Sequence, residues 1–441
     1  MNLISALDSL GNDGLARVQG RVVAVTGVLV EAEGIALPVG AECEIVSRSG
    51  TRTLAEVVGF SGERTHLLPE CGIDGIGPMD EVIHDGEIPS VPVSEELLGR
   101  VIDARGNPID GLGPITGTIR FPIENEPPPA LKRSLIEQPM STGVRAIDGV
   151  LTAGRGQRLG IFSGSGVGKS TLLGMIARNT DLPIRVIALI GERGREVREF
   201  LERDLGPEGL KNTVVVVATS DEAAVLRIRA AKVATSIAEW FRNSGRDVLL
   251  LVDSLTRVAL AQREVGLSAG EPPATRGYTP SVFAMMPKLL ERTGPGESAS
   301  ITAFYSVLVE ADDQHDPIGD AVRGILDGQI WLSRDYASKG WFPPIDPCVS
   351  TSRTMPAVVA EDHLQAARSL RESLAVYSEI EDLIRLGAFK QGQDARADRA
   401  ARLKPQIEKF LRQSPEEQSG FEQTRDRLIA LVSENEAVKS A

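Results

Sequence analysis

The chain has 441 residues, of which 42% are apolar and 25% charged, a balance typical of a globular protein with two or three domains. A net charge of −13 with only 4% aromatic residues argues against a nucleic-acid-binding protein, which needs basic and stacking side chains. No apolar run approaches the length of a membrane span, no basic region precedes the first apolar residues, and the three cysteines are widely spaced. We therefore expect a protein of the reducing cytoplasm.

The first 90 residues predict two units. Within residues 1–16, four apolar side chains fall on one helical face: Leu3, Ile4, Leu7 and Leu10. This face either packs on its own domain or docks a partner or a membrane surface, and the sequence leaves both open. Residues 17–90 alternate apolar and polar side chains in short runs separated by glycine, which predicts a small antiparallel β-barrel or sandwich.

The rest of the chain predicts an α/β core followed by helices. VPVSEELLGRVIDARGNPIDG indicates a helix and a strand, and ENEPPPALKR an extended connector. From about residue 140, buried-strand runs alternate with helical stretches, which is typical of a mostly parallel sheet covered on both faces: GIFSG, IRVIALIG, TVVVVAT, DVLLLVD and ITAFYSVLV. Beyond about residue 360 the pattern is helical. The expected domains are residues 1–16, 17–90, 91–365 and 366–441.

The stretch SGSGVGKST follows the strand GIF and precedes the helix STLLGMIAR, the context of a phosphate-binding loop. Ser163 stands where G-x-x-x-x-G-K-[ST] has its first glycine, and a small residue is tolerated there if its φ is negative. Lys169 can reach the β- and γ-phosphates, and the Ser170 hydroxyl can ligate Mg²⁺. A glycine-rich turn without a ligand is the alternative. The predicted nucleotide-binding residues of the loop are Gly164, Ser165, Gly166, Val167, Gly168, Lys169, Ser170 and Thr171.

Two other strand ends carry carboxylates. RDVLLLVDS ends in Asp253, which would meet Mg²⁺ directly or through water. ALIGERGREVREF places Glu192 and Arg193 at the end of another strand, where a carboxylate points into the ligand crevice of a parallel sheet. Glu192 can orient or deprotonate the water that attacks the γ-phosphate. Buried strands often end in Asp and surface loops often alternate charges, so both assignments depend on the phosphate loop.

Phosphoryl transfer also needs positive charge on its transition state. Arg257, four residues after Asp253, can approach the γ-phosphate within the same subunit. Arg353, in VSTSRTM, is distant in sequence from the phosphate loop and can serve a neighbouring subunit's site instead. A surface salt bridge, the commoner role of an arginine, is the alternative for both.

An acidic run, EADDQHDP, follows the strand ITAFYSVLV. It contains the metal-ligand types Asp312, Asp313, His315 and Asp316. A solvated acidic loop is the more common structure for such a run, and the other histidines are isolated in the sequence. We assign no histidine a catalytic role.

Together these motifs resemble the rotary-ATPase family, the group that contains the β subunit of ATP synthase, from about residue 17 to about residue 415. PPIDPCVSTS fits the family signature, LIGERGRE resembles the catalytic-subunit form of the Gly-Glu-Arg motif, and ATRGYTPSVF resembles the segment whose tyrosine, here Tyr278, lies near the nucleotide interface. Within the family, REVGLSAGEPPATRGYTPSVFAMMPKLLER and IGDAVRGILDGQI are similar to the ATPases of bacterial type III export, the flagellar and injectisome branch, with a lean to flagellar. A small residue at the position of Ser163 is common in that branch.

The resemblance implies a fold and an assembly. The fold is a small N-terminal β-barrel, a RecA-like core whose doubly wound, mostly parallel sheet carries the phosphate loop, and a short C-terminal helical domain. The assembly is a homohexamer that hydrolyses ATP with Mg²⁺ at its subunit interfaces to energise protein export. One subunit would supply Lys169, Ser170, Glu192, Arg193, Asp253 and Arg257, and the next would supply Arg353.

The resemblance also implies partners. These are a stator-like regulator at the N-terminal segment, a central stalk protein facing the loop around Asp312, Asp313 and Asp316, the export gate, chaperones and export substrates. Nucleic acid is not expected, and contact with the inner membrane is expected to be peripheral.

The sequence departs from the family pattern in three places, one of which is a short docking segment before residue 17. The adenine-stacking tyrosine expected just after His363 is Leu364 here, and Phe410 is the alternative lining of that pocket. The acidic lever motif of the β subunit is replaced by KQGQDARADRA, which counts against a proton-coupled ATP synthase catalytic subunit.

Two further alternatives remain. A hexameric RNA translocase also has a phosphate loop and an arginine finger, but it would need more aromatic residues within residues 17–90. A non-hydrolysing structural subunit would lack Glu192.

Overall fold

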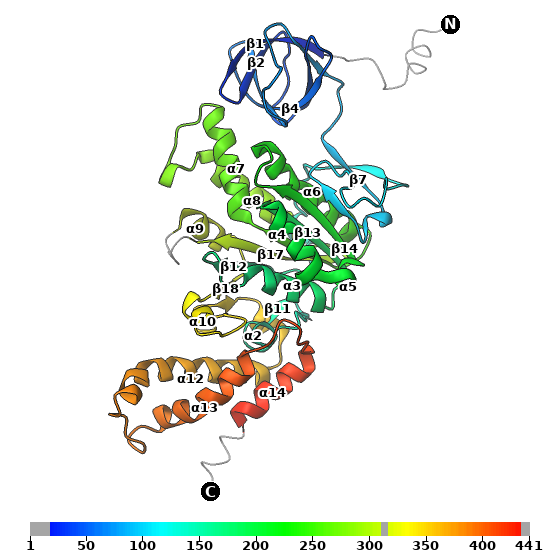
Figure 1. Ribbon diagram of the computed structural model, residues 1–441. Helices are drawn as coiled ribbons and strands as arrows, with labels where there is room; N and C mark the ends of the chain where they lie inside the picture. Colours follow the sequence, from blue (N-terminus) through cyan, green and yellow to red (C-terminus); the bar gives the residue numbers. More distant parts are fainter. Residues whose placement is uncertain (1–17, 310–315, 434–441) are drawn as a thin grey trace.

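The computed structural model describes residues 18–309 and 316–433, which form a barrel, a central sheet domain and a helical bundle arranged in line (Figure 1). The predicted fold class is confirmed. The predicted docking helix in residues 1–16 lies outside the described residues, as do Asp312, Asp313 and His315. Asp316 is described, and its carboxylate accepts a hydrogen bond from the Gly319 N–H, 2.8 Å away, as the cap of α9 (Pro317–Arg323).

The N-terminal unit is a closed barrel in the strand order β1-β2-β5-β4-β3-β6. Alternate side chains point inward, and Val22, Val30 and Val57 are fully buried in its core. Gly20 is needed where two strands come close, because a Cβ there would lie 2.6 Å from the Glu33 carbonyl oxygen. The strands are β1 (Val18–Thr26), β2 (Leu29–Glu33), β3 (Glu42–Val46), β4 (Arg52–Ser61), β5 (Arg64–Pro69) and β6 (Glu81–His84).

Charged side chains join the barrel to the central domain. Arg229, only 5% exposed, pairs with Glu42 of β3, and Arg105 contacts the same carboxylate at 3.3 Å. The Nε of Arg105 also donates to Glu70 Oε2 at 2.5 Å. Burial raises the pKa of the neighbouring Glu56 to about 7; Arg229 opposes the rise, and Glu42 and Glu70 add to it. Half-buried, hydrogen-bonded ion pairs of this kind hold the barrel in one orientation.

The central domain is built on a nine-stranded sheet with the main order β19-β18-β12-β17-β15-β13-β14-β8. The six pairings from β18 to β8 are parallel; β19 and β16 pair antiparallel at the margins. Its strands are β8 (Val101–Asp103), β12 (Arg158–Ser163), β13 (Ile184–Glu192), β14 (Thr213–Thr219), β15 (Val248–Asp253), β16 (Gly294–Pro295), β17 (Ser300–Leu308), β18 (Gly328–Leu332) and β19 (Thr351–Ser352). Two small ribbons flank it: β7 (Ser90–Val93) with β9 (Ile119–Pro122), and β10 (Pro139–Met140) with β11 (Ala153–Gly154).

Helices cover both faces of this sheet (Figure 1). One face packs against α6 (Ala224–Asn243), α7 (Leu255–Ser268) and α8 (Pro280–Glu291). The other packs against α3 (Lys169–Asn179) and the segment after it, which holds α4 (Gly194–Glu199), a π-helical turn (Phe200–Leu205) and α5 (Gly206–Leu210). The strands are therefore buried on both sides, which explains their unbroken runs of Val, Ile and Leu.

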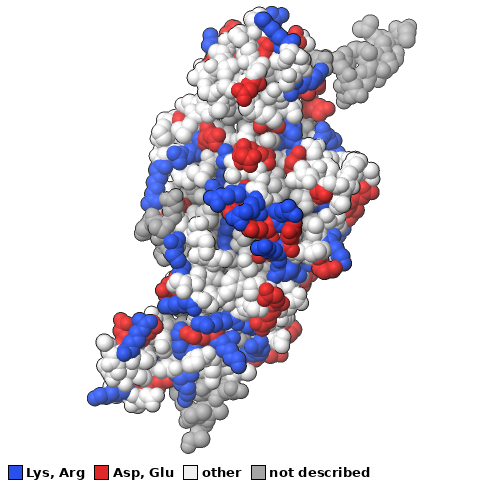
Figure 2. Space-filling view, viewed as in Figure 1, with Lys and Arg blue, Asp and Glu red and all other residues white. Residues whose placement is uncertain are grey.

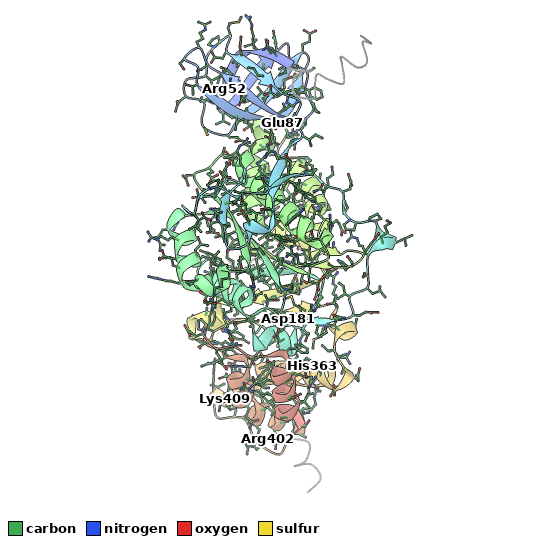
Figure 3. All side chains as sticks on the ribbon, turned by 90° about the vertical axis from the view of Figure 1, so that its right-hand side faces the viewer. Arg52, Glu87, Asp181, His363, Arg402 and Lys409 are labelled. Carbon is green, nitrogen blue, oxygen red and sulfur yellow. The ribbon has the colours of Figure 1, made fainter. Side chains whose placement is uncertain are left out.

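The C-terminal helices share a core with the central domain. α12 (Glu361–Arg385), α13 (Ala395–Leu411) and α14 (Phe421–Ser433) pack on α2 (Arg145–Val150), and their apolar side chains continue the core beneath α3. His363 lies at this junction (Figure 3), fully buried, with its Nε2–H donating to the Gly149 carbonyl at 2.9 Å. Short helices α10 (Arg334–Ser338) and α11 (Met355–Val358) complete the lower part of the sheet domain.

No helix in the described ranges combines the length and the apolar character needed to cross a bilayer.

Candidate active site

The loop SGSGVGKST joins the end of β12 to the start of α3. Ser163 is 1% exposed, and it is not among the described residues with positive φ. The positive φ values occur further along, at Gly166 (77°) and Gly168 (91°), where glycine is the residue that adopts them at low cost. The serine in place of the first glycine is therefore compatible with the backbone path of a phosphate loop.

The loop borders open space. A Cβ built at Gly166 would have nothing within 4 Å, and Ser165, Gly166 and Ser170 are exposed. Val167 is buried beneath them and anchors the loop. The α3 helix begins at Lys169, so its N-terminal dipole faces the same space. Thr171 is turned differently, because its hydroxyl hydrogen-bonds Asp204.

Three polar side chains from three segments meet beside the loop. Lys169 starts α3, Glu192 ends β13 and Asp253 ends β15. The Lys169 ammonium contacts the Asp253 carboxylate and lies 3.7 Å from Glu192 Oε1. Between β12 and β15 runs β17, whose Ser306 hydroxyl donates to Asp253 Oδ1 at 2.7 Å. The parallel sheet therefore brings the two carboxylates that the sequence predicted at strand ends beside the lysine that it predicted in the loop.

Glu192 is electrostatically distinct from an ordinary surface carboxyl. Burial raises its pKa; Lys169 opposes the rise and the Asp253 charge adds to it. Its carboxyl also hydrogen-bonds that of Glu196. Although partial burial raises the pKa of Glu196, this hydrogen bond and the nearby arginines lower it. A proton is therefore held more readily on Glu192 than on an exposed glutamate, a property of a general base.

Two predicted arginines differ in how they lie. Arg257 packs on Gly191, where an added Cβ would be 3.0 Å from the Arg257 Cβ, and its Nε is buried without a hydrogen-bond partner. A buried guanidinium nitrogen with no acceptor suits an incoming anion. Arg193 is 76% exposed and pairs with Glu196 at 3.4 Å, so its side chain lies in solvent.

The structure does not bring Arg353 to the phosphate loop of its own chain. Arg353 is exposed, and its N–H donates to the Asp327 carbonyl at 3.0 Å. Asp327 pairs with Arg158, the first residue of β12, whereas the loop follows the last residue of that strand. At about 3.3 Å per residue the two ends of β12 are roughly 16 Å apart.

Tyr278 is buried rather than open to a ligand. It is 7% exposed, its ring meets Phe283 edge to face at 6.3 Å between centroids, and the Arg263 guanidinium lies 5.7 Å from the ring. Its position near a nucleotide stays a prediction.

Phe342 is an aromatic side chain at the loop that the sequence analysis missed. A Cβ at Gly168 would lie 3.0 Å from Phe342 Cε2, so the ring touches the loop. Leu364 is half-buried on α12, and Phe410 is a core residue, 3% exposed, packed on Gly149. The suggestion that Phe410 lines an adenine pocket is therefore wrong. The sequence signal that could have identified Phe342 is the aromatic pair in WFPPIDP, next to the family signature.

The oxygen donors at the site suit Mg²⁺. Ser170 offers an exposed hydroxyl and Asp253 a carboxylate, the hard ligands that this ion takes. Within residues 18–309 and 316–433, no group of three or more His, Cys, Asp or Glu side chains forms a metal-binding cluster. Mg²⁺ held here would thus complete its shell with phosphate oxygens and water, as it usually does in nucleotide sites.

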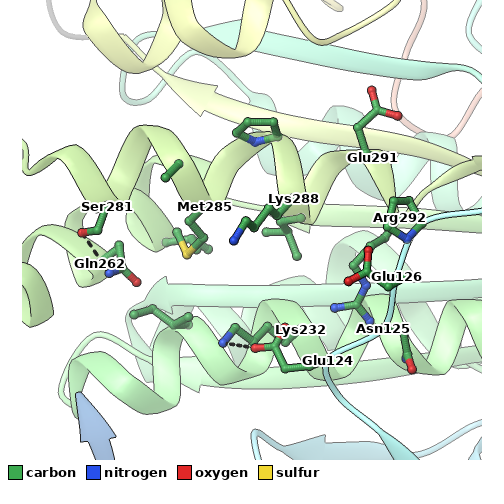
Figure 4. A pocket seen from close by; sticks show the side chains of 16 residues that line it. Glu124, Asn125, Glu126, Lys232, Gln262, Ser281, Met285, Lys288, Glu291 and Arg292 are labelled. Atoms are coloured by element: carbon green, nitrogen blue, oxygen red, sulfur yellow. Dashed lines mark hydrogen bonds and ion pairs between the residues drawn. The ribbon is translucent and has the colours of Figure 1, made fainter. Parts of the chain in front are cut away.

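A separate groove of about 800 Å³ lies on the other face of the sheet, among α6, α7, α8 and residues 124–127 (Figure 4). In it Lys232 pairs with Glu124, and the Gln262 amide donates to the Ser281 hydroxyl at 3.2 Å. Its lining contains none of the phosphate-loop residues.

The face shown in Figure 2 intersperses basic and acidic side chains over the sheet domain. On α4 and the turn after it, arginines pair with glutamates one helical turn away, as Arg195 with Glu199 and Arg198 with Glu202, both at 2.7 Å. A nucleic-acid track would instead present a continuous basic stripe.

Comparisons with known proteins identify the relatives of this chain. Residues 143–352 match the family described as ATP synthase alpha/beta family, nucleotide-binding domain, and residues 359–430 match the T3SS EscN ATPase C-terminal domain. The chain is 49% identical over 438 residues to the flagellum-specific ATP synthase of Bacillus subtilis, covering 99% of this chain and 100% of that protein. It is 50% identical over 419 residues to the type 3 secretion system ATPase of Xanthomonas euvesicatoria, covering 95% of each.

Solved structures of export ATPases are similar to this chain over most of its length. The assembled ATPase EscN of enteropathogenic E. coli superposes with a TM-score of 0.90 and 45% identity, covering 94% of this chain and 100% of that one. EscN in complex with its central stalk EscO gives a TM-score of 0.87 and 44% identity over the same shares.

Proposed function

Since the chain belongs to the ATP synthase alpha/beta family, in the branch that holds flagellum-specific and type 3 secretion ATPases, we propose that it hydrolyses ATP to energise protein export through a type III secretion apparatus, with a flagellar one favoured. One observation carries the proposal. Lys169, Glu192 and Asp253 meet beside a glycine loop that borders open space at the start of α3.

The loop binds the phosphates. Backbone N–H groups from Gly164 to Thr171 and the N-terminus of α3 face the β- and γ-phosphates, and Lys169 exchanges Asp253 for phosphate oxygen. Asp253 and Ser170 are then free to hold Mg²⁺. Bound Mg²⁺ supplies positive charge that neutralises the phosphate oxygens.

The surrounding side chains act on the reacting groups. Glu192 orients the attacking water and accepts its proton, for which its raised pKa suits it. Arg257 donates to the γ-phosphate as negative charge develops there. Arg193, at the rim, adds positive field. Phe342 offers a ring face on which the adenine base stacks.

Completion of the site requires a second subunit. Arg353 lies at the far end of β12 from its own loop, so it can reach a γ-phosphate only across an interface. A homohexamer with nucleotide at each interface, in which Arg353 and Tyr278 approach the neighbour's ATP, follows from this placement and is supported by the similarity to assembled EscN.

The partners follow from the same proposal. The EscN structure with its central stalk EscO supports a stalk protein in the ring pore. The other proposed partners are a stator-like regulator at residues 1–16, the export gate, chaperones and export substrates. The proposed location is the cytoplasm, with peripheral contact at the inner membrane. A proton-coupled ATP synthase subunit is disfavoured by the match of residues 359–430 to an export-ATPase C-terminal domain. An RNA translocase is disfavoured by the mixed charge in Figure 2.

The test is Mg²⁺-dependent ATPase activity per protomer across a wide range of protein concentrations. Specific activity is expected to climb as rings assemble and to level off when they are full. A flat profile from a sample that sizing shows to be monomeric would contradict the shared site. Absence of activity at every concentration would contradict the enzyme.

A further inference from the structure

The ring of Phe342 is held on the phosphate loop from the C-terminal helices. Its carbonyl accepts a hydrogen bond of 2.8 Å from the backbone N–H of Gln413, which lies two residues beyond the end of α13. The ring itself touches Gly168. Three residues thus form an unbroken contact path from the C-terminal domain to the nucleotide loop: Gln413, Phe342 and Gly168.

The side chain of Gln413 fixes the direction of that backbone N–H. It is 3% exposed, and its amide bonds both domains. Its Oε1 accepts from the Arg145 N–H at 2.8 Å, and its Nε2 donates to the carbonyls of Gly143 at 2.7 Å and Glu417 at 2.8 Å. A buried amide with its donors and acceptor all used is rigid, because any rotation leaves a polar group unpaired.

The residue before Phe342 is clamped from the same side. Trp341 stacks on Tyr336 of α10 at 4.6 Å with 11° between the ring planes. Over the Trp341 ring lie the Lys404 ammonium, at 5.3 Å, and the Arg412 guanidinium, at 5.0 Å, from α13 and its C-terminal cap. Cations at such distances are attracted to the face of an indole. α13 and the two residues after it therefore hold residues 341 and 342 through a hydrogen bond and two cation–π contacts.

We propose that Gln413 is a positioning residue for nucleotide binding: it holds Phe342 at the phosphate loop, so the affinity for the base of ATP depends on the packing of the C-terminal helices. The inference rests on the proposed function, because it needs ATP at this loop. A stacking ring contributes to affinity only when it is held in place before the ligand arrives, since ordering it afterwards costs free energy. Gln413 touches neither phosphate nor base in this arrangement and acts through Phe342.

The experiment compares equilibrium binding of ATP and of inorganic tripolyphosphate, each with Mg²⁺, by displacement of a fluorescent ATP analogue. Tripolyphosphate meets the loop but has no base. Gln413→Met keeps the side-chain volume and loses the amide bonds, and is expected to raise the Kd for ATP about tenfold while changing that for tripolyphosphate less than twofold. Gln365→Met is the matched control, because Gln365 is exposed on α12 and bonds Glu361 at 2.7 Å; its two Kd values should equal those of the unmodified chain.

A double-mutant cycle with Phe342→Ala tests the path itself. If Gln413 acts through Phe342, the double variant binds ATP no more weakly than Phe342→Ala alone. Lys404→Met removes one cation–π contact to Trp341 and leaves Gln413 in place, so it should raise the ATP Kd about threefold. This second variant tests the inference even if Gln413→Met does not fold. Equal weakening of both ligands, additive losses in the cycle, or an unchanged ATP Kd in Lys404→Met would overturn the inference. Failure of the unmodified chain to bind ATP would instead overturn the proposed function.

Discussion

The ammonium group of Lys169 contacts the carboxylate of Asp253. Lys169 follows the loop after β12, Asp253 ends β15, and β17 lies between these two strands in the sheet. In this arrangement each charge neutralises the other. A phosphate that enters the loop must replace Asp253 as the partner of Lys169, and the carboxylate released in that exchange is the proposed Mg²⁺ ligand. The ion pair thus holds both side chains in place beside the loop.

Removal of the ammonium group should abolish most nucleotide binding. Lys169→Ala is expected to weaken ATP binding about 10- to 100-fold, because a charge-assisted contact to phosphate is lost. Isothermal titration calorimetry measures this change. Lys232→Ala is the control, since Lys232 pairs with Glu124 in the groove on the other face of the sheet. Equal affinities in the two variants would show that the phosphates bind elsewhere.

Glu192 should matter for turnover and not for binding. Glu192→Gln keeps the size and loses the basicity of the side chain, so kcat should fall about 10²- to 10⁴-fold while the ATP Kd stays within about threefold. Steady-state hydrolysis and nucleotide titration together measure both. Glu199→Gln, on the helix α4 that follows the strand ending in Glu192 and paired with Arg195, should leave kcat unchanged. Hydrolysis at the unmodified rate in Glu192→Gln would remove Glu192 from the mechanism.

Arg353 should act on a neighbouring subunit. Arg353→Ala is expected to assemble normally and to hydrolyse ATP about 10³-fold more slowly. Mixed rings provide the decisive measurement. A Lys169→Ala subunit lacks a working phosphate loop but keeps Arg353. An Arg353→Ala subunit keeps a working loop but lacks Arg353. Mixing the two inactive variants should therefore restore activity at interfaces where an intact loop meets an intact Arg353. No recovery in rings shown by native mass spectrometry to be mixed would place both residues in one subunit's site.

The junction between barrel and sheet domain should make stability depend on pH. Folding raises the pKa of Glu56 from 4.5 to about 7, so between these values the folded chain binds the extra proton. Stability should therefore fall as pH rises from about 5 to about 8 and be level above that range. Glu56→Gln removes the titration and should be more stable than the unmodified chain by about 2 kcal/mol at pH 8, with a much smaller difference at pH 5.

Urea unfolding at the two pH values measures the effect. Glu44→Gln serves as the control, because Glu44 pairs with the largely exposed Arg52 at the barrel surface. A Glu56→Gln stability difference that is the same at pH 5 and pH 8 would show that Glu56 does not titrate between them.

Sequence alone predicts the part of the site that local pattern controls. An unbroken apolar run identifies a buried strand, and the first polar residue after it marks the ligand edge of a parallel sheet, which is how Glu192 and Asp253 were found. Arg257 follows by its spacing from Asp253 on α7. The barrel, too, is evident from alternation and glycine spacing, although its strand order is not.

Contacts between segments that are distant in the sequence leave no comparable local pattern. The aromatic pair in WFPPIDP draws attention to Phe342, but Phe342 reaches Gly168 because β18 lies beside β12, and the sequence does not indicate that pairing. The burial of Phe410 depends likewise on how α13 packs on α2. The family pattern expects an aromatic residue where this chain has Leu364, whereas the aromatic ring that lies at the phosphate loop, Phe342, comes from a different segment.

The in-line arrangement of the three units gives the chain a direction. Val18 begins the barrel at one end, and Ser433 ends α14 at the other (Figure 1). Identical chains placed side by side around an axis must all point the same way, so their ring has two unlike rims, one of β-barrels and one of helices. The two rims therefore offer different surfaces to their surroundings, so a partner that recognises β-barrels and a partner that recognises helices would bind at opposite ends of the same ring.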